Sequence, residues 1–219
     1  MPQSRPFLYL ISNRQAFRRS PDITELESWQ LQIEVIREAA QAGCQLVQIR
    51  ERDLSARDLC NFTRAAIGAA RPHGAKILVN DRLDVAITAG ADGVHLRVSS
   101  LPASEVRSIV SGRGLRDFLI GVSTHSLAEA QRAESSDADF IVCGPVFATP
   151  SKSSFGSPLG KERFAEICRS VKIPALALGG INLSNFRELL RSGAAGIAAI
   201  GLFIDRENLK LNIETIITS

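Results

Sequence analysis

The sequence contains no apolar run near the length of about 20 residues that a membrane-spanning helix needs, and its first residues lack the apolar core of a signal peptide. It also lacks paired cysteines, because Cys44, Cys60, Cys143 and Cys168 are widely separated and form no CxxC motif. These absences argue against a membrane protein, a zinc knuckle and a disulfide framework. We therefore expect a soluble, cytoplasmic protein whose thiols are reduced and buried.

Blocks of like charge are missing too. The chain holds 26 Lys and Arg residues against 23 Asp and Glu residues, a formal net charge of +3 that is spread along its length. So small a charge without a basic cluster gives little reason to expect nucleic acid as a partner. This charge distribution does not argue against a small anionic ligand.

Low-complexity segments and linkers are also absent. A length of 219 residues suits one large domain, and the shares of apolar residues, 45%, and charged residues, 22%, are close to the averages of soluble globular proteins. We predict a single domain over residues 1–219 with a sizeable buried core.

Short apolar runs rich in β-branched residues alternate with longer amphipathic segments along the whole chain. The runs have the length and continuity of parallel strands buried on both faces. The predicted strands are Phe7–Ser12, Leu46–Arg50, Ile77–Asn80, Gly93–Leu96, Phe118–Val122, Phe140–Cys143, Ala175–Leu178 and Gly196–Ile200. The predicted helices are Trp29–Ala42, Ala56–Ala70, Leu83–Ala89, Ala103–Ser111, Leu127–Ser135, Lys161–Ser170, Leu183–Arg191 and Glu207–Ile217.

Eight strand–helix units of about 27 residues each fill the chain. Parallel strands with right-handed crossovers in this number predict an α/β fold of the TIM type, a (β/α)₈ barrel. A doubly wound open sheet is the main alternative. It would carry a glycine-rich phosphate turn after the first strand, where this sequence has Ser12, Asn13 and Arg14.

Active sites of such barrels lie at the carboxyl ends of the strands, and polar residues follow the second predicted strand. Alternation sends Gln48, Arg50 and Arg52 to one side. Two guanidinium groups facing one cavity suit a phosphate ligand, because arginine binds phosphate with two hydrogen bonds and a fixed charge. The alternative is an ion-pair cluster of these arginines with Glu51 and Asp53 at the rim.

Two further strand ends carry candidates for metal binding and proton transfer. Asp81 follows the third strand, where it could bind Mg²⁺ or cap the next helix. His125 follows the fifth strand, where it could act as a general acid or base or be a surface histidine without a task. His95, inside an apolar strand, is interpreted as structural.

The last three strand ends carry glycine-containing loops. The long segment after the sixth strand holds Lys152 and several hydroxyls and ends in glycines, which is typical of a lid over an anionic ligand, although a solvated loop is the alternative. Glycines after the seventh and eighth strands would let backbone N–H groups face a phosphate. These phosphate-binding candidates are Gly179, Gly180, Ile200 and Gly201.

Taken together, the motifs from Tyr9 to Phe203 resemble the thiamine phosphate synthase superfamily, in its order and at its spacing. The motifs are Val47–Arg52 (VQIRER), Val79–Asp84 (VNDRLD), Ala91–Leu96 (ADGVHL), Gly121–Ser126 (GVSTHS), Gly144–Phe147 (GPVF), Leu178–Asn182 (LGGIN) and Ala194–Ile200 (AAGIAAI). The resemblance implies a (β/α)₈ barrel of thiamine biosynthesis that binds a thiazole phosphate.

Within the superfamily, the synthase joins 4-amino-2-methyl-5-hydroxymethylpyrimidine diphosphate to the thiazole phosphate and releases diphosphate with the help of Mg²⁺. The resemblance implies that Asp81 would bind Mg²⁺. It assigns the pyrimidine diphosphate to Gln48, Arg50, Arg52, Asn80 and Lys152, the lining of the substrate site to Ser123, Thr149 and Ser151, and the thiazole phosphate to Gly180, Ile200 and Gly201.

The chain departs from the synthase pattern after the fourth strand. The pattern reads Gly-Gln-x-Asp, with the Asp as the second Mg²⁺ ligand, whereas this chain has Arg97, Val98, Ser99 and Ser100. Ser100 brings no charge and Arg97 adds a cation, so Mg²⁺ binding should be weak. Two milder changes are Arg52 in place of Lys and Gly201 in place of Ser.

The loss of that acid favours the sister group, the TenI-type thiazole tautomerases, which need no metal. In this interpretation His125 moves the proton on the carboxylated thiazole phosphate, and Arg50 or Lys152 pairs with the substrate carboxylate. The first alternative is a Mg²⁺-assisted thiamine phosphate synthase. The second is a non-catalytic regulator that retained the phosphate site.

Overall fold

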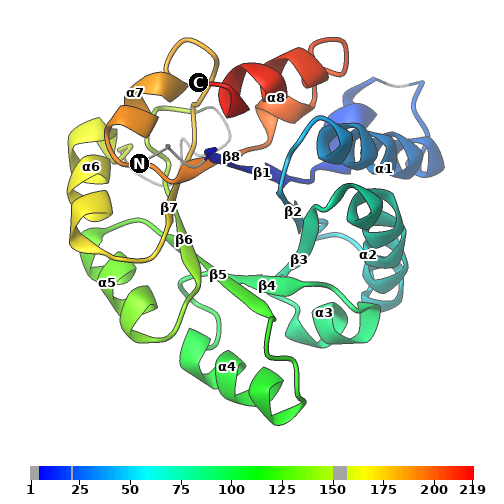
Figure 1. Ribbon diagram of the computed structural model, residues 1–219. Helices are drawn as coiled ribbons and strands as arrows, with labels where there is room; N and C mark the ends of the chain where they lie inside the picture. Colours follow the sequence, from blue (N-terminus) through cyan, green and yellow to red (C-terminus); the bar gives the residue numbers. More distant parts are fainter. Residues whose placement is uncertain (1–4, 21, 150–156) are drawn as a thin grey trace. The chain divides into compact units, whose positions relative to one another are not determined.

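The computed structural model describes residues 5–20, 22–149 and 157–219. Its strands form a closed barrel in the chain order β1 to β8 (Figure 1). The predicted (β/α)₈ barrel is thereby confirmed, and the doubly wound open sheet is wrong. The chain divides into two compact units, Leu8–Val94 with Ala199–Thr218, and His95–Ala198 with the N-terminal residues up to Phe7 and with Ser219. The single domain over residues 1–219 stays a prediction.

Every predicted strand is present within two residues of its expected bounds. The strands are β1 Phe7–Ile11, β2 Leu46–Ile49, β3 Lys76–Asn80, β4 Gly93–Leu96, β5 Leu119–Thr124, β6 Phe140–Cys143, β7 Ala175–Leu178 and β8 Gly196–Ala199. The α-helices are α1 Glu25–Gln41, α2 Ala56–Ala70, α3 Leu83–Ala89, α4 Ala103–Gly112, α5 Leu127–Ser135, α6 Gly160–Ser170, α7 Phe186–Arg191 and α8 Leu209–Ile217. Short 3₁₀ helices are η1 Arg14–Arg19, η2 Arg71–His73 and η4 Gly201–Phe203.

In the unit built on Leu8–Val94, strands β1, β2 and β3 are parallel neighbours, with Tyr9 opposite Leu46 and Ile49 opposite Val79. All four residues of β2 are buried, as expected of a strand covered on both faces. Figure 1 shows α1, α2 and α3 outside these strands.

Helix α1 begins at Glu25, four residues before the predicted start at Trp29. The cause is a capping box in which the Thr24 hydroxyl accepts the backbone N–H of Glu27, while the Glu27 carboxylate accepts the backbone N–H of Thr24. The first turn carries no apolar periodicity, so the hydrophobic pattern did not reveal it.

In the unit built on His95–Ala198, strands β5 to β8 are parallel neighbours, and α4 to α7 lie on their outer side (Figure 1). Helix α7 begins at Phe186, three residues after the predicted Leu183. The preceding residues form a turn instead, because the Asn182 side-chain oxygen accepts the backbone N–H of Ser184.

All four cysteines are free, as predicted, and three of them are buried. Burial raises the pKa of the Cys44 thiol to about 12 and that of Cys143 to about 11, so both stay protonated and inert at neutral pH. In the described ranges, no helix is both long enough and apolar enough to cross a membrane.

Candidate active site

Gln48 lies buried near the carboxyl end of β2. Its side-chain nitrogen donates a hydrogen bond to the Tyr9 hydroxyl at 3.3 Å. Burial raises the pKa of Tyr9, so this phenol remains neutral and can accept the bond. Tyr9 therefore holds one end of the amide, and the second N–H and the carbonyl oxygen of Gln48 are the groups a ligand could use.

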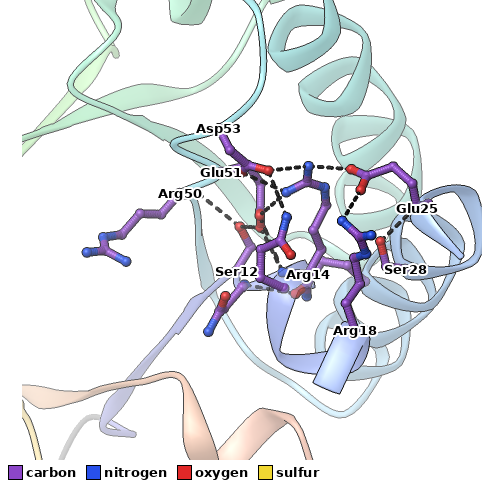
Figure 2. Close-up of polar contacts among 11 residues, drawn as sticks. Ser12, Arg14, Arg18, Glu25, Ser28, Arg50, Glu51 and Asp53 are labelled. Atoms are coloured by element: carbon purple, nitrogen blue, oxygen red, sulfur yellow. Dashed lines mark hydrogen bonds and ion pairs between the residues drawn. The ribbon is translucent and has the colours of Figure 1, made fainter. Parts of the chain in front are cut away.

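Arg50 and Asn80 each stand one residue beyond the paired residues Ile49 and Val79 of two neighbouring strands. The Arg50 backbone N–H donates to the Ser12 hydroxyl at 2.9 Å, and its guanidinium points away from the polar cluster on the other side of the main chain (Figure 2). The register of β2 and β3 thus places two predicted diphosphate-binding residues at the same height along the two strands. Arg52, the second candidate cation of this loop, is exposed.

The rim cluster that the sequence offered as an alternative role for Arg50 and Arg52 exists, but Arg14 supplies its cation. The Arg14 guanidinium pairs with the carboxylates of Glu25 at 2.5 Å, Asp53 at 2.7 Å and Glu51 at 3.3 Å (Figure 2). Arg14 thus pairs with Glu51 and Asp53, the two acids of that alternative, and the diphosphate-binding role of Arg50 and Arg52 stays a prediction.

Arg14 is not among the site residues that the sequence predicts. Its side chain is 1% exposed although it carries a full charge. The hydrogen bond from Arg14 is the main reason that the pKa of Asp53 falls to about 2, whereas burial holds the pKa of Glu51 above its ordinary value. The one signal was position, since Arg14 follows the end of β1 as the other candidates follow their strands.

Asp81 has the backbone conformation that a functional strand end often shows. Its φ is 66°, in the left-handed region that non-glycine residues rarely adopt. The N-cap position of α3 belongs to Arg82, which pairs with Asp84 at 2.6 Å, so Asp81 does not occupy the capping position that the sequence left open. The charge of Asp81 contributes, after the larger effect of Asp84, to the raised pKa of Arg82.

Few side chains at this site could bind Mg²⁺. Within residues 5–20, 22–149 and 157–219, no three His, Cys, Asp or Glu side chains are grouped to hold a metal ion. The hydroxyl of Ser100, at the position of the second acid, accepts the backbone N–H of Arg97 at 2.9 Å. Mg²⁺ is commonly held by one or two carboxylates together with substrate phosphates. The residues present therefore fit an ion that arrives with a diphosphate and meets the single carboxylate of Asp81.

His125 lies at the end of β5 with an exposed ring. Its Nδ1 forms a hydrogen bond with the carbonyl oxygen of Gly144, and its backbone N–H donates to the Glu129 carboxylate at 2.6 Å. A carbonyl can only accept, so Nδ1 carries the proton, and in the neutral ring Nε2 is the atom with a lone pair. This geometry permits acid–base chemistry at Nε2.

A buried residue of the core, His95, holds the side chain of Ser123. Its hydroxyl lies 2.9 Å from Nε2 of His95, whose side chain is 2% exposed and packs beside Phe140. This contact agrees with the structural interpretation of His95. Ser123 also lines a cavity of about 140 Å³ in the same unit, with apolar walls and the side chains of Arg97 and Arg132.

The loops after β6 and β7 are joined by backbone hydrogen bonds. The Phe147 N–H donates to the carbonyl oxygen of Gly179 at 3.1 Å. A Cβ atom at Gly179 would lie 2.5 Å from the Cβ of Pro145, and one at Gly180 would lie 2.7 Å from the carbonyl oxygen of Ala148. Both glycines have positive φ, so close packing already requires them there. A phosphate-binding role for them stays a prediction.

Ile200 and Gly201, in the other unit, lie at the start of η4. A Cβ at Gly201 would meet no atom within 4 Å, so packing does not require glycine at this position. Thr149 is half-buried, whereas Ser151 and Lys152 lie outside the described residues, as do all of residues 150–156 of the predicted lid.

Comparison with known proteins agrees with this arrangement. Residues 8–203 match the family model described as thiamine monophosphate synthase. A putative thiamine-phosphate synthase of Geobacter sulfurreducens is 44% identical over 171 residues, which are 78% of this chain and 78% of that protein. The thiamine-phosphate synthase of Chlorobium phaeovibrioides is 37% identical over 197 residues, 90% of this chain and 86% of the relative.

Solved structures agree as well. A thiamine phosphate pyrophosphorylase from Pyrococcus furiosus superposes with a TM-score of 0.80 and 32% identity, covering 98% of this chain and 95% of its own. A 3-hexulose-6-phosphate synthase has a TM-score of 0.68 at 14% identity and shares the fold alone. On the match over residues 8–203 and these identities, the chain belongs to the thiamine monophosphate synthase family of thiamine-biosynthetic TIM-barrel enzymes.

Proposed function

We propose that the protein is a thiamine-phosphate synthase, which couples hydroxymethylpyrimidine diphosphate to thiazole phosphate and releases diphosphate. The observation that carries the proposal is 44% identity over 78% of both chains to a relative named for this activity. The tautomerase, which the sequence departure at Ser100 favoured, is supported only at the level of the superfamily. The family match also argues against a purely regulatory protein.

The proposed reaction breaks the bond between the pyrimidine methylene carbon and the diphosphate oxygen. Negative charge grows on the leaving diphosphate, so groups of fixed positive charge lower the barrier. In this proposal Arg50, Arg52 and Lys152 bind the diphosphate, with Gln48 and Asn80 as hydrogen-bonding partners. Mg²⁺ bound by the diphosphate and Asp81 would neutralise part of the same charge when present.

The thiazole phosphate is assigned to the glycine loops. Gly179 and Gly180 would offer backbone groups after β7, and Ile200 and Gly201 after β8. Ser123, Thr149 and Ser151 are proposed to line the substrates. The Ser123 hydroxyl is held by His95, so it would meet a ligand without first having to be ordered.

One observation favours isomerisation of a carboxylated thiazole phosphate as a second candidate. The hydrogen bond between His125 Nδ1 and Gly144 directs the ring so that Nε2 is available for proton transfer. In this reaction His125 would move the proton, while Arg50 or Lys152 would pair with the carboxylate. No metal would be needed.

The test is an assay of the purified protein with pyrimidine diphosphate, thiazole phosphate and Mg²⁺, in which thiamine phosphate is quantified. Arg50→Ala should raise the KM for the pyrimidine diphosphate, whereas Arg57→Ala, an exposed arginine on α2, is the matched control. Turnover supports the synthase. Absence of product together with isomerisation of the carboxylated thiazole, lost in His125→Asn, would establish the tautomerase instead.

A further inference from the structure

Arg14 is a buried cation that is held by three carboxylates. Taking a guanidinium out of water is costly, and buried ion pairs are weak evidence for stability because desolvation offsets their attraction. Two of its partners, Glu25 and Asp53, are about half exposed, at 49% and 48%. Only Glu51, at 1%, is as deeply buried as Arg14 itself.

Glu51 connects Arg14 to the main chain at Arg50. One carboxylate oxygen of Glu51 accepts the Ser12 hydroxyl at 2.5 Å, and the Arg14 backbone N–H lies within 3.3 Å of both oxygens. Ser12, which is fully buried, in turn accepts the backbone N–H of Arg50 at 2.9 Å. The hydrogen bonds run without a break from Arg14 through Glu51 and Ser12 to Arg50 (Figure 2).

This series of hydrogen bonds holds the main chain just beyond the end of β2. Strand pairing holds the backbone as far as Ile49, so the hydrogen bond from Arg50 to Ser12 is a side-chain anchor for the first residue beyond the strand. Figure 2 shows Glu51 turned toward Arg14 and the Arg50 guanidinium leaving on the opposite side. The orientation of one residue therefore constrains that of its neighbour.

We propose that Arg14, Glu51 and Ser12 are positioning residues that hold the main chain at Arg50, so that its guanidinium is presented for binding the diphosphate of the substrate. The inference rests on the proposed function, in which Arg50 binds the pyrimidine diphosphate. Pre-ordering a long side chain at its base spares part of the entropy that binding otherwise costs.

The experiment measures the KM for each substrate in Ser12→Ala and Glu51→Gln. Ser12→Ala removes both the hydrogen bond to Glu51 and the one that anchors the Arg50 N–H. Losing the anchor at Arg50, about 1 kcal/mol, corresponds to roughly a fivefold change, so the KM for pyrimidine diphosphate should rise at least about fivefold, while the KM for thiazole phosphate stays unchanged. Arg18→Ala is the matched control. It lies on the same helix η1 and pairs with Glu25 at 2.6 Å, but takes no part in the chain to Arg50.

A double variant separates positioning from a general structural role. In the Arg50→Ala background, Ser12→Ala should raise the KM no further, because residues that act through one another are non-additive. Calorimetry with inorganic pyrophosphate gives a second readout that needs no turnover, and the affinity should fall in parallel. Additive effects, or equal rises in both KM values, would overturn the inference.

The two proposals fail in different ways. If Arg50→Ala weakens diphosphate binding and Ser12→Ala and Glu51→Gln do not, the positioning chain is wrong and the proposed function stands. If Arg50→Ala itself leaves pyrophosphate affinity and turnover unchanged, the assignment of Arg50 falls, and the inference falls with it.

Discussion

The Nε2 atom of His95 and the hydroxyl oxygen of Ser123 lie 2.9 Å apart, which ties a ring that is 2% exposed to a serine at the end of β5. The other ring nitrogen borders Gly121, where an added Cβ would lie 2.8 Å from His95 Nδ1. The imidazole therefore fills a space in the core and holds a hydroxyl in a defined position.

His95→Ala should lower the free energy of unfolding by about 2–4 kcal/mol, because it opens a cavity and leaves the Ser123 hydroxyl without its buried partner. Urea unfolding followed by circular dichroism measures the change. His73→Ala, at an exposed histidine of η2, is the control and should leave the unfolding midpoint unchanged. An unchanged midpoint in His95→Ala would contradict the packing role.

If Mg²⁺ binds at Asp81 as proposed, Asp81→Asn should reduce coupling activity by about 100-fold, because it removes this carboxylate while asparagine tolerates the left-handed backbone. Its melting temperature should match that of the parent protein. Asp81→Ala should also lose about 1 kcal/mol of stability, since alanine is strained at a φ of 66°. Full activity in Asp81→Asn would remove Asp81 from the mechanism.

If the turn at Ser100 supplies a Mg²⁺ ligand, as the resemblance to the synthase pattern implies, Ser100→Asp should lower the Mg²⁺ concentration needed for half-maximal activity several-fold, because a carboxylate strengthens binding of a hard divalent cation. The measurement is a Mg²⁺ titration at saturating substrates, with Ser100→Asn as the uncharged control. A titration curve that does not move would show that this turn does not approach the metal.

Acid should destabilise the protein partly through Asp53. Its pKa lies at about 2, below the ordinary value of 3.8, mainly because of the hydrogen bond from Arg14. A pKa that is lower in the folded state means that the stabilisation is complete above pH 4 and is lost as the pH falls toward 2. Asp53→Asn should therefore have a flatter stability profile between pH 4 and pH 2, measured by thermal unfolding, and equal slopes would contradict the pairing.

Gly180→Ala and Gly201→Ala should have different effects on stability. The first places a Cβ 2.7 Å from the carbonyl oxygen of Ala148 at a φ of 65°, so it should reduce stability by about 1–2 kcal/mol or more. The second meets no atom within 4 Å and keeps its backbone N–H, so it should fold normally and leave the KM for thiazole phosphate unchanged. A raised KM in a folded Gly201→Ala would contradict phosphate binding through the backbone N–H alone.

Much of the fold follows from local patterns. Continuous apolar runs identified all eight strands, and helical spacing identified the eight helices, because burial on a strand or a helix leaves a short-range period in the sequence. Starts at Glu25 and Phe186 were misplaced where a capping box or an asparagine turn, and not apolar residues, decides the boundary. The candidate residues at the strand ends were predicted from position and resemblance.

The sequence by itself determined the barrel, the family and the set of polar residues at the carboxyl ends of the strands, since each depends on periodicity or on motifs of a few consecutive residues. Only the tertiary structure decided which partners those residues have. Arg14 and Glu51 are 37 positions apart, and no local pattern pairs them. The parallel pairing of β1 with β2 brings them together, and burial then makes their ion pair and hydrogen bonds obligatory.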